Sequence, residues 1–123
     1  RFNIVKWLKS ASGFSEGGPF PNVKIWAYYG SSIPSKDSYK NENRFKKLTS
    51  SYNFEWIGST GQDGSHEVTL KRSNLPTGFM FHAAKTKTME CSISYFDADD
   101  IIKKAEGTYN KRQFRIRLAV IEK

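Results

Sequence analysis

The stretch NVKIWAYYG, Asn22 to Gly30, alternates residue by residue in the way that an extended strand requires. Apolar and aromatic side chains fall on both faces of such a strand: Val23, Ile25, Ala27 and Tyr29 on one, and Trp26 and Tyr28 with Lys24 on the other. A strand that is apolar on both faces has to be covered on both sides. This stretch therefore predicts a strand that is buried on both faces.

The same two-residue alternation recurs along the rest of the chain, and turn residues separate the repeats. It predicts further strands over residues 52–58, 66–72, 79–86, 91–96 and 113–123. The segment SNLPTG, with its Asn, Pro and Gly, reads as a turn between the third and fourth of these, so residues 66–86 are predicted to form one β-hairpin. In the last strand, Phe114, Ile116 and Leu118 point inward while Arg115 and Arg117 point outward.

Helical patterns are few and short. Residues 97–107 predict a helix of about two turns, with Asp97 as its N-cap and Gly107 as its stop. The segments 41–51 and 2–9 fit either a helix or an extended chain. Residues 10–22 and 30–43, which are rich in Gly, Ser, Pro and Asn, are expected to be irregular, the second of them a mobile surface loop.

The fold class that follows is all-β and mainly antiparallel: a sandwich or small barrel with one or two short helices, formed by residues 1–123 as a single domain. The spacing of strands and helices does not match a parallel nucleotide-binding fold. No run of about 18 apolar residues occurs, so we expect no transmembrane segment, and the first residues lack the pattern of a signal peptide.

The chain is strongly basic, with 20 Lys and Arg against 12 Asp and Glu and a formal charge of +8. This excess favours partners that are polyanions, such as nucleic acid. Residues 1–61 carry nine basic and four acidic groups and residues 62–123 carry eleven and eight. Because no basic tail accounts for the excess, a binding surface has to be assembled by folding.

The segment KRQFRIR holds the densest group of cations, with Arg115 and Arg117 on one strand face and Lys111 and Arg112 in the turn before it. Further cations are predicted near the ends of the two hairpin arms, and aromatic rings beside Lys24 could stack on bases. The predicted polyanion-binding residues are Lys111, Arg112, Arg115, Arg117, Lys71, Arg72, Lys85 and Lys87, with Trp26 and Tyr28 as aromatic contacts. The competing interpretation is that these charges only keep the sheet soluble and protect its edges.

A metal-independent ribonuclease is the catalytic alternative, because two imidazoles can serve as general base and acid while a cation stabilises the phosphorane. Its candidate residues are His66, Glu67 and His82, with Lys71 and Arg72 as cations. The expected register argues against this pair, since His66 falls on the apolar face of its strand and His82 falls opposite to the phenylalanines of its own. The sequence favours a binding module over an enzyme.

No cofactor is expected. His66, His82 and Cys91 lack the short paired spacing of zinc sites, and the acidic residues of FDADD fit the start of a helix better than a calcium loop. The glycines of GFSEGGPFPN are followed by prolines where a phosphate-binding loop would begin its helix. The sequence thus predicts a non-enzymatic module that binds a polyanion, with nucleic acid as the first choice. The alternative is a secreted or surface sandwich that recognises a protein or a glycan.

Overall fold

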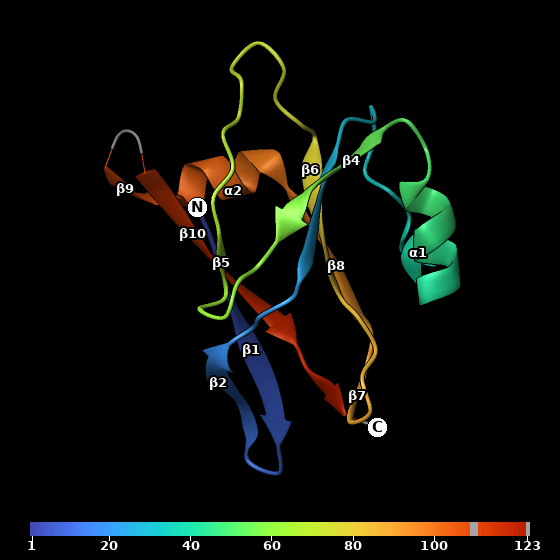
Figure 1. The fold of residues 1–123 in the computed structure, drawn as a ribbon, viewed down its shortest axis with the longest axis vertical. Coiled ribbons are helices and arrows are strands. Elements are labelled where there is room, and N and C mark those ends of the chain that lie inside the picture. Colours follow the sequence, from blue (N-terminus) through green and yellow to red (C-terminus); the bar gives the residue numbers. More distant parts are fainter. Residues whose placement is uncertain (109–110, 123) are drawn as a thin grey trace.

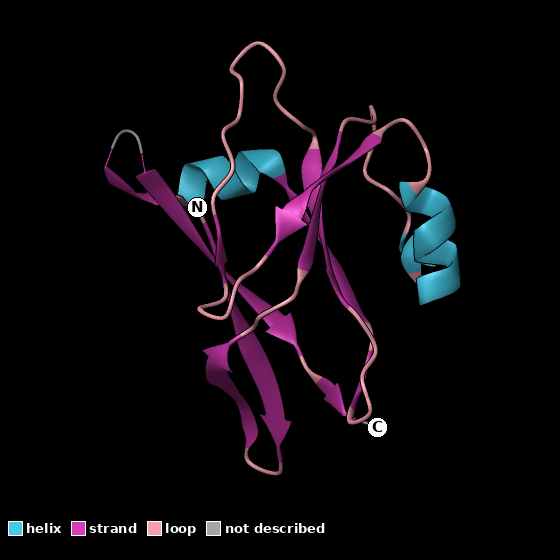
Figure 2. Ribbon diagram, viewed as in Figure 1, coloured by secondary structure: helices cyan, strands magenta, loops and turns pink. Residues whose placement is uncertain are grey.

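A computed structural model describes residues 1–108 and 111–122, and it consists mainly of β-strands with two short α-helices (Figures 1 and 2). The first sheet contains β2 (Gly13–Pro19), β1 (Phe2–Ser10), β10 (Lys111–Ala119) and β9 (Glu106–Thr108) in that order, with β5 (Ser65–His66) also paired to β1. The second sheet has the order β4 (Phe54–Ser59), β3 (Lys24–Tyr28), β6 (Gly78–Ala83) and β8 (Ser92–Asp97). A small two-stranded sheet joins β7 (Met89–Glu90) to β11 (Ile121–Glu122).

The two larger sheets enclose the main hydrophobic core, so the predicted all-β, sandwich-like architecture is confirmed. The core draws on both sheets and on one helix: Phe2, Ile4, Ile116 and Leu118 from the first sheet, Ile25, Ala27, Phe79 and Phe81 from the second, and Ile101 from α2 (Ala98–Lys104). The rings of Phe2 and Phe81 meet edge to face with centroids 5.5 Å apart. The described strands do not close into a barrel.

Strand β3 is the centre of the second sheet, as the alternation of residues 22–30 predicts. It pairs antiparallel with β4 on one side and with β6 on the other. Ile25 and Ala27 are fully buried in the main core, while Tyr28 lies in a second core cluster with Phe45 and Met80. That cluster covers the opposite face of the same sheet, so β3 is buried on both sides.

Helix α1 (Glu42–Thr49) builds the second cluster and settles the open choice for residues 41–51 in favour of helix. The side-chain oxygen of Asn41 accepts a hydrogen bond from the backbone N–H of Arg44 at 2.9 Å, which is the usual N-cap arrangement. Phe45 points from this helix into the sheet. A short 3₁₀ turn, Lys36–Tyr39, precedes it in the segment predicted to be irregular.

The helix predicted over residues 97–107 is confirmed, but it is shorter. It ends at Lys104, and Gly107 lies in β9 with φ at 128° instead of stopping the helix. Asp97 is at the N-cap position, although its side chain makes no capping hydrogen bond. No helix in the described part of the chain is long and apolar enough to span a membrane.

The predicted hairpin over residues 66–86 is wrong. Strand β6 is paired on both edges, with β3 and with β8, so no edge is free for a hairpin partner. Residues 67–77 instead form an irregular loop, the yellow-green loop at the top of Figure 1. Val68 and Leu70 still pack against the main core, which explains the apolar alternation that suggested a strand.

The N-terminal segments also differ from expectation. Residues 2–9, left open between helix and strand, form β1, which pairs parallel with β10 in register from Phe2 opposite Phe114. Residues 10–22 are largely regular, because β2 makes an antiparallel hairpin with β1. A Cβ atom at Gly17 would lie 2.9 Å from a methyl group of Leu8, so the side chain of Leu8 would have to move if a larger residue replaced this glycine.

Candidate polyanion interface

Strand β10 divides the predicted cations between its two faces. Arg115 lies opposite Asn3 and Arg117 opposite Val5 on the outer side of the first sheet, as predicted, while Ile116 and Leu118 are buried. Arg112 is part of the strand and not of a preceding turn. Its even position puts it on the same side as Phe114, away from Arg115 and Arg117. Lys111 begins the strand, and its side chain lies outside the described residues.

The two outward arginines share one carboxylate. Arg115 Nη2 donates to Glu16 Oε2 at 2.5 Å, and Arg117 Nε donates to Glu16 Oε1 at 2.9 Å. Glu16 reaches them from β2, across the intervening strand β1. The side chains of Arg115 and Arg117 nevertheless stay 61% and 58% exposed.

Two aromatic rings lie beside these arginines, and sequence reasoning missed both of them. Trp7 of β1 and Phe14 of β2 stack with centroids 5.7 Å apart and planes only 1° from parallel. The guanidinium carbon of Arg117 lies 4.7 Å from the centre of the Trp7 ring. Such contacts join a cation to an aromatic face. The outer face of the first sheet, defined here by Trp7, Phe14, Glu16, Arg115 and Arg117, is thus a mixed surface of cations and rings.

The other predicted cations do not join this outer face. Lys71 and Arg72 belong to the loop between β5 and β6, which forms the top of Figure 1, whereas Lys85 and Lys87 belong to the segment between β6 and β7, which runs toward the lower end of the figure. The backbone N–H of Lys85 donates to Glu42 Oε1 at 3.0 Å. Because the predicted hairpin does not form, the arms that were to align these cations are absent.

Trp26 and Tyr28 belong to the core, which corrects their prediction as aromatic contacts. Tyr28 is only 9% exposed and packs on Phe54 with ring centroids 4.8 Å apart. Trp26 is partly buried and meets Phe45 of α1 edge to face. The less apolar face of β3, which carries both rings, is covered by α1, so we remove both residues from the candidate contacts.

His82 lies beneath α1. It is 7% exposed, its ring centroid is 4.7 Å from that of Phe45, and its Nε2 lies 3.3 Å from Glu42 Oε1. Burial lowers the pKa of its imidazole below the ordinary value, although Glu42 opposes this shift. The pKa of the Glu42 carboxyl is also lowered, chiefly by the hydrogen bond from the Lys85 backbone N–H.

His66 occupies a different place, where it links the two sheets. From β5 of the first sheet its Nε2 lies 2.6 Å from the carbonyl oxygen of Ile57 in β4. The ring packs over Gly58, where φ is 131° and a Cβ atom would lie only 2.3 Å from the imidazole. Glu67, the next residue, is exposed. His66 reaches β4 from the first sheet, whereas His82 packs against α1, which covers the other face of the second sheet, so the structure does not pair the two imidazoles as an acid and base.

Other catalytic chemistry finds little support among the described residues. Burial raises the pKa of the Cys91 thiol, with Glu42 and Glu90 adding to the effect, so little reactive thiolate forms near neutral pH. Among the His, Cys, Asp and Glu side chains that the structure describes, no group of three or more could hold a metal ion. Comparisons with protein families, with curated proteins and with solved structures find no match for this chain.

Proposed function

We propose that the outer face of the first sheet binds a polyanion, with nucleic acid as the partner. The observation that carries the proposal is the pair of exposed guanidinium groups on β10 beside the parallel Trp7–Phe14 stack. Phosphate contacts need clustered cations, and single-stranded nucleic acid also needs rings on which bases stack. This face offers both.

Charge on the outer face is consistent with such a partner. Lys9 is exposed and lies opposite Phe14 in the β1–β2 hairpin, so it adds to the positive charge of Arg115 and Arg117. Glu16 is the acidic side chain that contacts the two arginines. The formal charge of +8 on the whole chain adds a long-range attraction to any polyanion.

Glu16 occupies only some of the hydrogen-bond donors of Arg115 and Arg117. A guanidinium has five N–H donors in a planar fork, and each arginine donates through a single nitrogen to this carboxylate. The remaining donors can bind phosphate oxygens while Glu16 holds the two groups in fixed positions. Glu16 therefore orders the cations, at the cost of some repulsion toward an approaching phosphate.

Phe14 supplies the stacking surface. Its side chain is 57% exposed even though one ring face lies against Trp7. A base that stacks on the free face of Phe14 would extend the ring stack outward. Stacking of this kind contributes about 1 to 3 kcal/mol for each base and tolerates any sequence. We therefore propose binding that is not specific for sequence.

The test is a titration of the full chain against labelled single- and double-stranded DNA, RNA and heparin over a series of salt concentrations. In the variant Arg115→Ala/Arg117→Ala, affinity should fall for every polyanion, and the salt slope should become shallower by about one unit for each lost phosphate contact. Glutamate at both sites should weaken binding further by repulsion. Glu16→Gln should strengthen binding, because a competing negative charge is removed.

A charge-matched control is available on α1. Lys46→Ala/Lys47→Ala removes the same formal charge from two exposed residues that lie on the other sheet's helix. If binding depends on this outer face, the α1 variant should lose much less affinity than the β10 variant. Equal losses would show that net charge alone drives binding. A wild-type chain that binds none of the polyanions would remove the proposal and favour a protein or glycan partner.

A further inference from the structure

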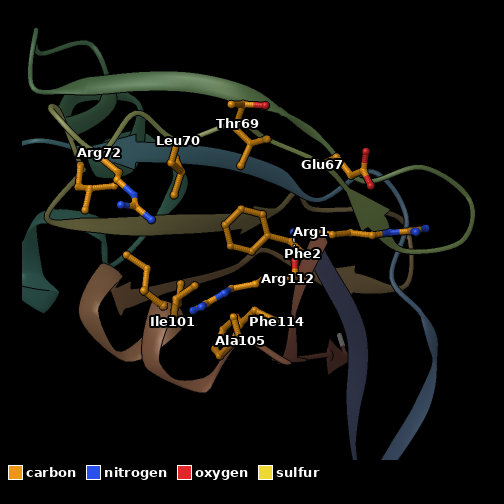
Figure 3. Close-up of a pocket in the computed structure, with 13 residues that line it drawn as sticks. Arg1, Phe2, Glu67, Thr69, Leu70, Arg72, Ile101, Ala105, Arg112 and Phe114 are labelled. Carbon is orange, nitrogen blue, oxygen red and sulfur yellow. Dashed lines mark hydrogen bonds between the residues drawn. The ribbon is translucent and has the colours of Figure 1, made fainter. Parts of the chain in front are cut away.

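The inner side of β10 opens at its beginning into a cavity of about 610 Å³. Figure 3 shows the cavity between the loop that follows β5, helix α2 and the first residues of β1 and β10. It lies on the opposite side of β10 from the outer face described above, because Arg112 and Phe114 line it and Arg115 and Arg117 do not. Its size is within the range of about 300 to 1,000 Å³ that small-molecule sites have.

The walls of this cavity are mostly apolar. The side chains that give it this character are Phe2, Val68, Leu70, Leu75, Ile101 and Phe114. Phe2 and Ile101 belong to the buried core, so the inner wall is fixed by the packing between the sheets. Leu75 is 47% exposed and contributes to the cavity from the loop. Such walls suit the apolar body of a ligand.

Two arginines give the cavity a positive end. Figure 3 shows the guanidinium groups of Arg72 and Arg112 on the same side, near Leu70 and Ile101. Neither forms an ion pair with another described residue. Arg1 also lines the cavity, but its guanidinium donates to Ser65 Oγ at 2.9 Å and to Asp63 Oδ2 at 3.3 Å. Glu67, the acidic residue of the lining, lies toward Arg1 in Figure 3 and away from Arg72.

We infer that this cavity binds a small organic anion that joins one carboxylate head to an apolar chain. The head pairs with Arg72 and Arg112, whose planar N–H donors match the two oxygens of a carboxylate. The chain lies along Phe2, Leu70 and Phe114. A fully hydrophilic anion would leave the apolar wall wet, and an uncharged chain would bring no negative charge to the two arginines. The site is independent of polyanion binding on the outer face.

Decanoate is the probe, with decanol and inorganic phosphate as matched comparisons that lack the head or the chain. Calorimetric titration of the full chain should detect binding of decanoate. Decanol should bind about tenfold more weakly, because it lacks a charge-assisted contact with the arginines, and phosphate should give no signal. Amide shifts in a nitrogen-15 NMR titration should concentrate in residues 67–75 and in α2. Equal binding of decanoate and decanol, or shifts centred on β2, would overturn the inference.

Variants locate the head group. Arg72→Gln and Arg112→Gln should each weaken decanoate binding about tenfold and bring it toward decanol, while Lys47→Gln on α1 should leave it unchanged. Leu75→Asp, on an exposed part of the loop, should weaken decanoate binding by placing a negative charge in the lining of the cavity. Unchanged decanoate affinity in both arginine variants would overturn the assignment. Because Arg115 and Arg117 do not line the cavity, failure here leaves polyanion binding on the outer face unaffected, and the reverse also holds.

Discussion

The outer and inner faces of β10 carry arginines in contrasting surroundings. On the outer face, Arg115 and Arg117 hydrogen-bond to Glu16, and Arg117 also covers the Trp7 ring. On the inner face, Arg112 lies at an apolar cavity near Arg72, without an ion pair to any described residue. A single basic stretch of sequence therefore serves two separate surfaces.

The difference shows that alternation along a strand divides a cluster of charges in the sequence between the two faces of the sheet. In KRQFRIR, neighbouring residues point to opposite sides of the sheet, so residues that are adjacent in the sequence have different surroundings in the fold. The surroundings of each arginine come from other elements: β1 and β2 bring a carboxylate and a ring stack to the outer face, and the loop after β5 brings apolar side chains to the inner face.

The largest expected effect concerns stability across β10. Leu118→Ala removes a fully buried side chain from the main core and should lower the free energy of unfolding by about 2 to 5 kcal/mol. Arg117→Ala, one residue away on the exposed face, should cost about 0 to 1 kcal/mol, because its ion pair is largely solvated. Urea unfolding of both variants measures the contrast, and similar losses would contradict the assignment of faces.

The next prediction distinguishes the contribution of base stacking to binding on the outer face from the contribution of charge. Phe14→Ala should weaken binding of single-stranded DNA by about 1 to 3 kcal/mol, because a base loses its stacking surface. Heparin has no bases, so its affinity should stay the same. Tyr52→Ala, which alters a ring that is 95% exposed elsewhere on the chain, is the matched control for both ligands. An equal loss of DNA and heparin binding would show that Phe14 acts through structure and not through stacking.

The smallest expected effect tests whether the β10 surfaces are independent of the layer under α1. Burial lowers the pKa of His82 from 6.5, so the unfolded chain takes up a proton at a higher pH than the folded chain. The free energy of unfolding should therefore fall as the pH drops below about 6.5 and level off once the folded-state pKa is passed.

His82→Gln should remove this part of the pH dependence while keeping a donor for Glu42. The variant Arg115→Ala/Arg117→Ala should retain it, because those residues lie on the other sheet. The measurement is the unfolding midpoint across the acidic range. If the pH dependence disappeared in the arginine variant, the outer face on β10 and the layer around His82 would be energetically coupled, which would contradict their independence.

Much of the fold could be predicted because it depends on local alternation. Residues 22–30 and 113–119 show apolar positions at every second residue, and both form strands with the expected faces buried. The hairpin over residues 66–86 failed because pairing is not local: β8, farther along the chain, occupies the edge of β6 that the hairpin needed. Val68 and Leu70 belong to a loop and alternate because they pack against the main core, and the pattern alone does not distinguish such a loop from a strand.

The candidate interface was predicted in part. Outward arginines at positions 115 and 117 follow from the alternation, but their partners Glu16 and Trp7 lie about a hundred residues earlier in the chain. The parallel pairing of β1 with β10 brings them together, and no local pattern indicates that pairing. In the same way, the sequence does not show what covers the less apolar face of β3, because the covering helix α1 comes from a segment that fits either a helix or an extended chain.

The most direct test of polyanion binding on the outer face uses Trp7 as a local probe. In a variant carrying Trp26→Phe and Trp56→Phe, Trp7 is the remaining tryptophan, and it lies against Phe14 and Arg117. Titration with a single-stranded oligonucleotide should change its fluorescence to saturation, with a midpoint that weakens as salt rises. The change should vanish at the same concentrations when Arg115→Ala/Arg117→Ala is added. An oligonucleotide that binds with unaltered Trp7 emission would contradict the account.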